Sequence, residues 1–153
     1  MTEIRSKSDG QSGAADSGGM HAADAVVLRL LRDRIGDPSV LYRFGSSVEG
    51  ALRGDSDIDY AVLAIRPLGA VERFDLQEDV ARALRRSVDL VDLRRASTVL
   101  RIQVVASGVP VAVGDAPERE RFEILTYASY ARLNEERRAI LEQIAEERTV
   151  YGR

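Results

Sequence analysis

Two aspartates separated by one residue are the clearest candidates for chemistry in this chain. Asp57 and Asp59 open an apolar run, residues 57–64, whose composition predicts a β-strand. Side chains alternate along a strand, so both carboxylates should point to one face, with Cα atoms roughly 6.5–7 Å apart. Two bare carboxylates at that distance repel each other, and a divalent cation between them would relieve the repulsion. Mg²⁺ suits these ligands, because it takes one or two carboxylates together with substrate phosphates.

A glycine and a serine precede this pair at a defined spacing. Gly45 and Ser46 follow a strand candidate at residues 39–44, and ten residues separate Ser46 from Asp57. Glycine lets the backbone approach a phosphate closely, successive N–H groups can form an anion-binding nest, and the serine hydroxyl adds a donor. One short segment therefore combines phosphate-binding groups with a metal-binding pair, which is the combination that nucleotide transfer requires.

A third carboxylate is expected from another strand candidate, residues 87–93. Asp89 and Asp92 lie three residues apart in this segment, so on a regular strand they point to opposite faces. Only one of them can join the first two aspartates, where it could bind a second metal ion or accept a proton from an attacking hydroxyl. Alternation alone leaves the choice between the two open.

Composition limits what else the chain can do. With 153 residues, 44% hydrophobic and 31% charged, one globular domain is expected. The absence of cysteine and the single histidine, His21, exclude disulfides, thiolate metal sites and histidine relays. A net charge of −3 argues against nucleic acid as the main ligand. No apolar run is long enough to span a membrane and no signal peptide is evident, so we expect a cytoplasmic protein.

The remaining segments predict a small α/β domain. Residues 1–19 are rich in Gly, Ser, Asp and Ala and are expected to form a disordered tail; Met20 is a plausible natural start. The domain itself should occupy residues 20–115, as a mixed β-sheet with helices packed against it. Besides the three strands already described, the apolar periodicity predicts a strand at residues 109–113 and helices at residues 21–35, 70–86 and 96–107. The side chains expected to point inward from the second and third helices are Phe74, Val80, Leu84, Val99, Leu100 and Val104.

A long charged helix is predicted at the C-terminal end. Residues 116–153 form this region, in which residues 117–149 alternate Glu and Arg densely, as in a solvated helix with ion pairs four residues apart. A helix of about 32 residues spans roughly 48 Å, which is more than so small a domain can cover. Its intermittent apolar stripe either packs on the chain's own core or, as we expect, contacts a partner. The stripe consists of Phe122, Leu125, Leu133, Ile140, Leu141 and Ile144.

The arrangement Gly45-Ser46, ten residues, Asp57-x-Asp59 and a later aspartate resembles the signature of the minimal nucleotidyltransferases of the DNA polymerase β-like superfamily. The resemblance covers roughly residues 21–115 and is greatest to the adenylyltransferase antitoxins paired with HEPN toxins, the MntA-like family. It implies the polymerase β-like nucleotidyltransferase fold, classed as α/β or α+β. It also implies transfer of AMP from ATP to a tyrosine of a HEPN ribonuclease.

In that family pattern the third aspartate opens a Val-Asp-Leu-Val-Asp-Leu strand, which favours Asp89 over Asp92. The resemblance therefore assigns catalysis and the binding of two Mg²⁺ ions to Asp57, Asp59 and Asp89. It assigns the triphosphate of ATP to Gly45 and Ser46.

The sequence departs from the family pattern at one position. Many relatives carry Arg or Lys where Glu49 stands, and Arg43 or Arg53 could supply the missing positive charge.

Two alternative functions remain open. One is a nucleotidyltransferase acting on a small molecule, such as an aminoglycoside, although about 40 residues beyond the sheet leave little chain to enclose an acceptor. The other is an antitoxin that neutralises its partner by binding alone.

Overall fold

The computed structural model describes residues 14–48 and 56–151, which alternate between strands and helices. The helices and strands are α1 (Ala14–Ile35), β1 (Val40–Phe44), the 3₁₀ turn η1 (Gly45–Ser47), β2 (Ile58–Leu63), α2 (Ala70–Leu84), β3 (Val88–Asp92), α3 (Thr98–Ser107), β4 (Val109–Val113) and α4 (Ala116–Tyr151). The predicted strands and helices are therefore present, with ends that differ by a few residues.

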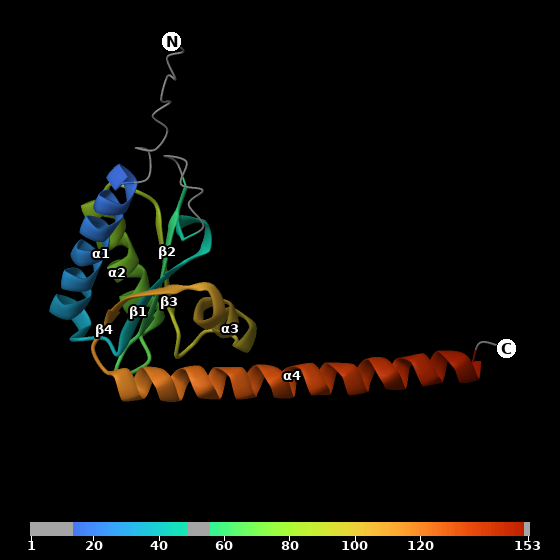
Figure 1. The fold of residues 1–153 in the computed structure, drawn as a ribbon. Helices are drawn as coiled ribbons and strands as arrows, with labels where there is room; N and C mark the ends of the chain where they lie inside the picture. Colours follow the sequence, from blue (N-terminus) through green and yellow to red (C-terminus); the bar gives the residue numbers. More distant parts are fainter. Residues whose placement is uncertain (1–13, 49–55, 152–153) are drawn as a thin grey trace, which may run out of the picture.

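The four strands form one mixed sheet in the order β3-β2-β1-β4. β1 runs antiparallel to both β2 and β4, whereas β2 and β3 are parallel and are connected through α2. Figure 1 shows α1 and α2 on one side of the sheet and α3, with the first turns of α4, on the other. This arrangement confirms the predicted fold, a small mixed sheet flanked by helices.

β2 lies inside the sheet and is buried on both faces. Ile58 and Tyr60 point toward α1 and α2, whereas Ala61 and Leu63 point toward α3. Two cores result, one on each face, and they share this strand. Because a strand covered on both faces exposes little side-chain surface, β2 is a rigid support for groups at its end.

The start of α1 differs from the sequence-based expectation. α1 begins at Ala14 rather than at His21, so residues 14–19, which were assigned to the tail, are helical; residues 1–13 lie outside the described part. Gly18 and Gly19 lower the helix propensity of this stretch, which is why composition did not indicate a helix. Once a packed helix exists, however, adding a turn to its end needs no new nucleation.

Two side chains expected in the core were wrongly placed. Phe74 is 52% exposed and Val99 is 46% exposed, whereas Leu76 is buried in its place. Successive residues of a helix are turned by about 100°, so Phe74 and Leu76 cannot both face the sheet. Val80 and Val104 are fully buried, as predicted. Phe74 is large and apolar, but the size of a side chain does not determine which side of a helix faces inward.

The long C-terminal helix is confirmed and extends far beyond the domain (Figure 1). Its beginning is anchored to the sheet, because the Tyr42 hydroxyl of β1 donates a hydrogen bond to Glu123, which also accepts one from Arg119 Nε at 2.7 Å. Thr126 is its last buried residue, and residues 134–150 are all exposed. Within the described residues, no helix has the length and apolarity needed to cross a membrane.

The orientation of α2 can be tested by two alanine substitutions. Leu76→Ala should lower the free energy of unfolding by about 2–5 kcal/mol, because it leaves a cavity in the core between α2 and the sheet. Phe74→Ala should change it by less than about 1 kcal/mol, because half of that ring is already in water. Urea unfolding followed by circular dichroism measures both. An equal loss in the two variants would contradict the placement of α2.

Candidate active site

Three aspartates meet at one end of the sheet, and Asp59 lies at their centre. In the strand register, Asp59 of β2 is opposite Phe44 of β1 and Asp89 of β3. Neighbouring strands are about 4.8 Å apart, so the carboxylates of Asp59 and Asp89 share one face of the sheet at close range. Asp57 precedes β2 by one residue. The structure therefore brings all three aspartates of the sequence motif together.

The charges of this cluster are unfavourable without a cation. The pKa of Asp59 is raised above its ordinary value, first because the carboxyl is partly buried and then because Asp89 and Asp57 are negatively charged neighbours. Asp57 and Asp89 themselves are exposed. The partly buried carboxylate is thus held between two others, and removal of water and like charge both oppose its ionisation.

Asp92 lies away from this cluster and binds backbone N–H groups instead. It is buried on the opposite face of the sheet, where its carboxylate accepts hydrogen bonds from the backbone N–H of Leu68 at 2.8 Å and of Arg94 at 3.0 Å. These bonds connect the segment after β2 with the turn after β3. Alternation along β3 therefore places Asp89, and not Asp92, beside the first two aspartates.

Gly45 allows the backbone to pass directly beside the Asp59 carboxylate. Its φ is +71°, a conformation that favours glycine, and a Cβ built on it would lie only 2.3 Å from Oδ2 of Asp59. Glycine is required here for two reasons, the backbone conformation and the space. The sequence predicted a close approach between Gly45 and a phosphate; the approach that the structure shows is to the carboxylate of Asp59.

The two serines after Gly45 have separate roles. Ser47 is buried and its hydroxyl donates to the carbonyl oxygen of Phe44 at 3.1 Å, which closes the turn. Ser46 is exposed at the same end of the sheet as the aspartates, where its hydroxyl is accessible to a ligand. Glu49 and Arg53 fall within residues 49–55, outside the described part of the chain.

Arg43 points away from the aspartates, so it does not compensate for Glu49 with a positive charge. It is in register with Tyr60 and therefore points to the face opposite Asp59. There its Nε lies 3.7 Å from Oδ1 of Asp24, and only 12% of its side chain is exposed. Asp24 also accepts a hydrogen bond from the Tyr60 hydroxyl at 2.7 Å. Arg43 thus belongs to a buried polar cluster under α1, which corrects the expectation that it could compensate for Glu49.

Three further side chains, which sequence reasoning missed, hold the backbone beside the aspartates. Arg86 Nη2 donates to the carbonyl of Ser56, the residue before Asp57, at 3.0 Å. Gln77 and Arg73 of α2 bind the N–H and carbonyl of Leu90, the residue after Asp89, at 3.0 and 2.9 Å. β3 is an edge strand, so Gln77 and Arg73 satisfy backbone groups of Leu90 that lack a strand partner. In sequence they resemble an ordinary solvated helix face.

The cluster is suited to Mg²⁺ that arrives with a phosphate ligand. Its donors are carboxylate oxygens, the hard ligands that Mg²⁺ prefers. Among the residues that the structure describes, no three acidic, histidine or cysteine side chains already converge on one point as a complete metal cage. Mg²⁺ commonly uses one or two protein carboxylates and completes its coordination with water and substrate phosphates, so a full protein cage is not needed.

Comparison with known proteins identifies relatives of the chain. The family described as polymerase beta, nucleotidyltransferase matches residues 29–116, a span that contains every aspartate of the cluster. The protein adenylyltransferase MntA of Shewanella oneidensis is 42% identical over 118 residues, which are 77% of this chain and 84% of the relative.

Several solved structures are also similar to this chain. A chain of a toxin–antitoxin complex with AMP-PNP superposes with a TM-score of 0.72 and 40% identity, over 80% of this chain and 98% of that one. A second complex pairs a tri-AMPylated Shewanella oneidensis HEPN toxin with an MNT antitoxin; there the TM-score is 0.68 and the identity 38%, over 81% and 97% of the two chains. A third is an MntA–HepT mutant in which two aspartates two positions apart are replaced by glutamate, with a TM-score of 0.70 and 38% identity over 80% and 98%.

The close approach at Gly45 can be tested against a second glycine of similar backbone. Gly36 has φ +82°, but a Cβ added there meets nothing within 4 Å. Gly36→Ala should therefore lower the free energy of unfolding by only about 1–2 kcal/mol, the strain of a left-handed residue. Gly45→Ala should lower it further and displace Asp59. Urea unfolding of both variants measures the difference, and equal effects would show that the contact with Asp59 does not constrain this position.

The raised pKa of Asp59 predicts a substitution that stabilises the folded protein. Because the folded state favours protonated Asp59, its ionisation costs stability as pH rises through the raised pKa. Without divalent cations at pH 7, Asp59→Asn should raise the Tm. The gain should disappear below the ordinary pKa of aspartate, about 3.9, where the carboxyl is protonated in both states. Calorimetry across this pH range measures it, with Asp75→Asn on the exposed face of α2 as the control. A Tm lowered at pH 7 would contradict the repulsion.

Proposed function

The chain belongs to the polymerase β nucleotidyltransferase family, and we propose that it is an antitoxin that transfers AMP from ATP to a tyrosine of a cognate HEPN toxin. The observation that carries the proposal is the meeting of Asp57, Asp59 and Asp89 at the end of the sheet, beside Gly45. The identity of 42% with a protein adenylyltransferase supports the reaction, and the related complexes support the partner.

The residues of the cluster fit two Mg²⁺ ions. Asp57 and Asp59 would bind both ions, and Asp89 would complete the second site. When bound, the ions would offset the repulsion among the carboxylates and neutralise charge that develops on the phosphate oxygens. Gly45 and Ser46 would bind the triphosphate through backbone N–H groups and the exposed hydroxyl. The relative crystallised with AMP-PNP, an ATP analogue, supports ATP as the nucleotide.

The proposed transfer is a single displacement at the α-phosphorus of ATP. The oxygen of the acceptor hydroxyl forms a bond to this phosphorus, while the bond to the oxygen bridging the α- and β-phosphorus atoms breaks. Pyrophosphate leaves with that oxygen. Asp89, which is exposed at the edge strand, accepts the proton of the hydroxyl and returns it to water. The products are a tyrosine joined to AMP and free pyrophosphate, and no redox step occurs.

We propose that residues 20–115 carry catalysis and that α4 is the helical extension of this domain. Transfer to a protein explains why the site lies open at the end of a sheet: Asp57 and Asp89 are exposed, and a folded partner could reach them. We place the reaction in the cytoplasm, where ATP and Mg²⁺ are available.

The proposal is tested by the intact mass of a HEPN-family protein encoded beside this chain, after incubation with ATP and Mg²⁺. Wild-type chain should add AMP units to it, located on tyrosine by peptide sequencing. The double variant Asp57→Asn, Asp59→Asn should slow the transfer by at least about 100-fold, because the charges that hold the metal are lost. Asp75→Asn, which removes an exposed acid elsewhere, is the matched control and should transfer normally.

Two outcomes would contradict the proposal. No mass gain with any of the four nucleoside triphosphates would defeat protein modification, and labelling of an aminoglycoside in its place would point to a small-molecule acceptor. If the double aspartate variant still neutralised the toxin fully in cells, binding alone would be sufficient and catalysis would not be the basis of protection.

A further inference from the structure

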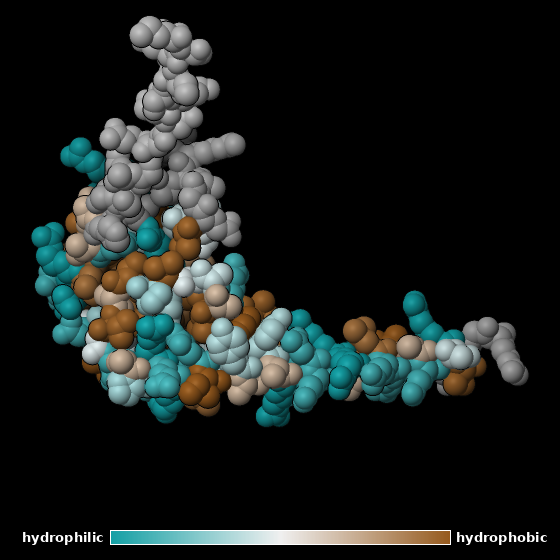
Figure 2. Space-filling view, in the orientation of Figure 1, coloured by the Kyte–Doolittle hydropathy of each residue, from teal (hydrophilic) through white to brown (hydrophobic). Residues whose placement is uncertain are grey.

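The distal half of α4 carries apolar side chains that no described residue of the domain covers. Ile140, Leu141 and Ile144 are 56%, 66% and 46% exposed, although they lie well beyond the last buried residue, Thr126. Figure 2 shows apolar residues gathered on the upper side of this part of the helix, and the lower side there is mainly hydrophilic. Apolar residues gathered mainly on one side of a free helix indicate a surface that is covered by another molecule.

Three residues of the apolar stripe, Leu133, Ile140 and Ile144, fall at core positions of a coiled-coil heptad, and Leu141 flanks them. Leu133, Arg137, Ile140, Ile144 and Glu147 follow one another at intervals of four, three, four and three residues, the alternation of core positions in a heptad repeat. This alternation keeps the five residues on one seam of the helix. The seam is apolar except for one positive and one negative residue, whose positions determine which pairings are possible.

The positions of these two charges determine which second helix can pair with this one, and in which orientation. If two copies of the helix pair antiparallel about Glu142, then Ile140 of each lies opposite Ile144 of the other. In the same register Arg137 lies opposite Glu147, since both pairs are centred on the same residue. A parallel pair would instead place Arg137 against Arg137 and Glu147 against Glu147, and like charges across a seam oppose association. The seam is therefore complementary to itself in one orientation only.

We propose that residues 133–150 of α4 pair with the same segment of a second copy of this chain, as a short antiparallel coiled coil. This inference does not depend on the proposed function. The pairing is also sterically possible, because the centre of the seam lies sixteen residues beyond Thr126, or about 24 Å along the helix. The two domains would then be held at opposite ends of the paired helices.

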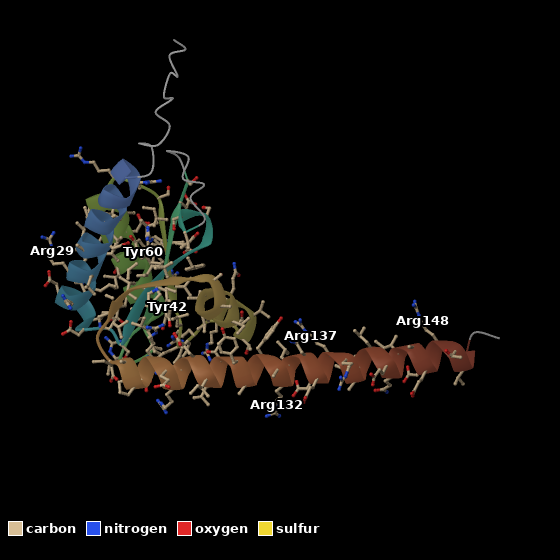
Figure 3. The ribbon with its side chains drawn as sticks, viewed as in Figure 1. Arg29, Tyr42, Tyr60, Arg132, Arg137 and Arg148 are labelled. Carbon is tan, nitrogen blue, oxygen red and sulfur yellow. The ribbon has the colours of Figure 1, made fainter. Side chains whose placement is uncertain are left out.

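The other charges of the distal helix are consistent with this pairing. Arg132 and Arg138 form ion pairs on the helix surface, with Nε atoms 3.1 Å from Glu136 and 3.9 Å from Glu142. Within the described residues Arg137 makes no ion pair, and Figure 3 shows it projecting from the side of α4 opposite to Arg132. This is the upper side, on which Figure 2 shows the apolar residues. Arg137 is thus positioned to meet a group on a second helix.

The seam is short, about two and a half heptads, so we expect a dimer that depends on concentration. Sedimentation velocity of the full chain without any toxin, from low micromolar to several hundred micromolar, should show a monomer that converts to a dimer. The double variant Ile140→Asp, Ile144→Asp should remain a monomer throughout. Circular dichroism and the unfolding of the domain should be unchanged, because both residues lie on the exposed part of the helix.

Charge reversal tests the register. Arg137→Glu should raise the dissociation constant of the dimer at least about tenfold, because it places like charges in the seam. Adding Glu147→Arg to it should restore association, since the pair is then reversed but still complementary. Arg138→Glu makes the same change of charge on the outer surface, where its neighbour is Glu142, and should leave the dissociation constant unchanged.

Cross-linking tests the orientation directly, because the chain has no cysteine of its own. In the antiparallel register Asn134 of one copy lies near Arg148 of the other. A mixture of Asn134→Cys and Arg148→Cys chains should therefore cross-link with a short bismaleimide, whereas neither variant should cross-link to itself. A chain that stays monomeric at every concentration would overturn the proposal. So would self-cross-linking of Asn134→Cys, which indicates parallel pairing, or a distal stripe whose Ile variants affect only toxin binding.

Discussion

Three carboxylates that repel one another are gathered at one end of a four-stranded sheet, and the surrounding structure holds them there. Asp59 is the most constrained of them, because it is partly buried and has a negative neighbour on either side, so its pKa is raised. A folded protein can maintain such a cluster only if the supporting backbone is stable without it. β2 provides that support, since it lies within the sheet and its side chains are packed on both faces.

The same constraint explains the residues around the cluster. Gly45 adopts a positive φ and carries no Cβ, so the turn after β1 can run against the Asp59 carboxylate. Arg86 and Gln77 bind backbone groups next to the other two aspartates, at places where no strand partner is available. Asp92 shows the contrast. Its carboxylate is buried among N–H donors that satisfy it, whereas the aspartates of the cluster are left for a cation and a substrate.

α4 combines two parts with different physical roles. Its first turns belong to the domain: Phe122 packs against the core beside α3 and under the guanidinium of Arg101, and Glu123 accepts hydrogen bonds from the sheet and from its own helix. Beyond Thr126 the helix leaves the domain, and no other part of the described structure covers its distal apolar residues. The helix thus carries an association surface away from the aspartates and leaves the approach to them open.

Much of this protein could be predicted from sequence, because the informative patterns are local. The alternation of Asp57 and Asp59, the spacing from Gly45 and the strand-like VDLVDL segment each depend on neighbouring residues, and they predicted the strands and the aspartate pair. The long helix followed in the same way from its charge pattern. Such patterns reflect the local conformation of the backbone, which a few neighbouring residues determine.

Only the tertiary structure decided the rest, since it depends on contacts between residues far apart in the chain. Asp89 rather than Asp92 joins the cluster because of the parallel register of β2 and β3. Leu76 rather than Phe74 faces the core because of how α2 lies on the sheet, and Arg43 is withdrawn from the site by Asp24 of α1. Local sequence specifies which groups a segment offers, whereas packing specifies which of them meet.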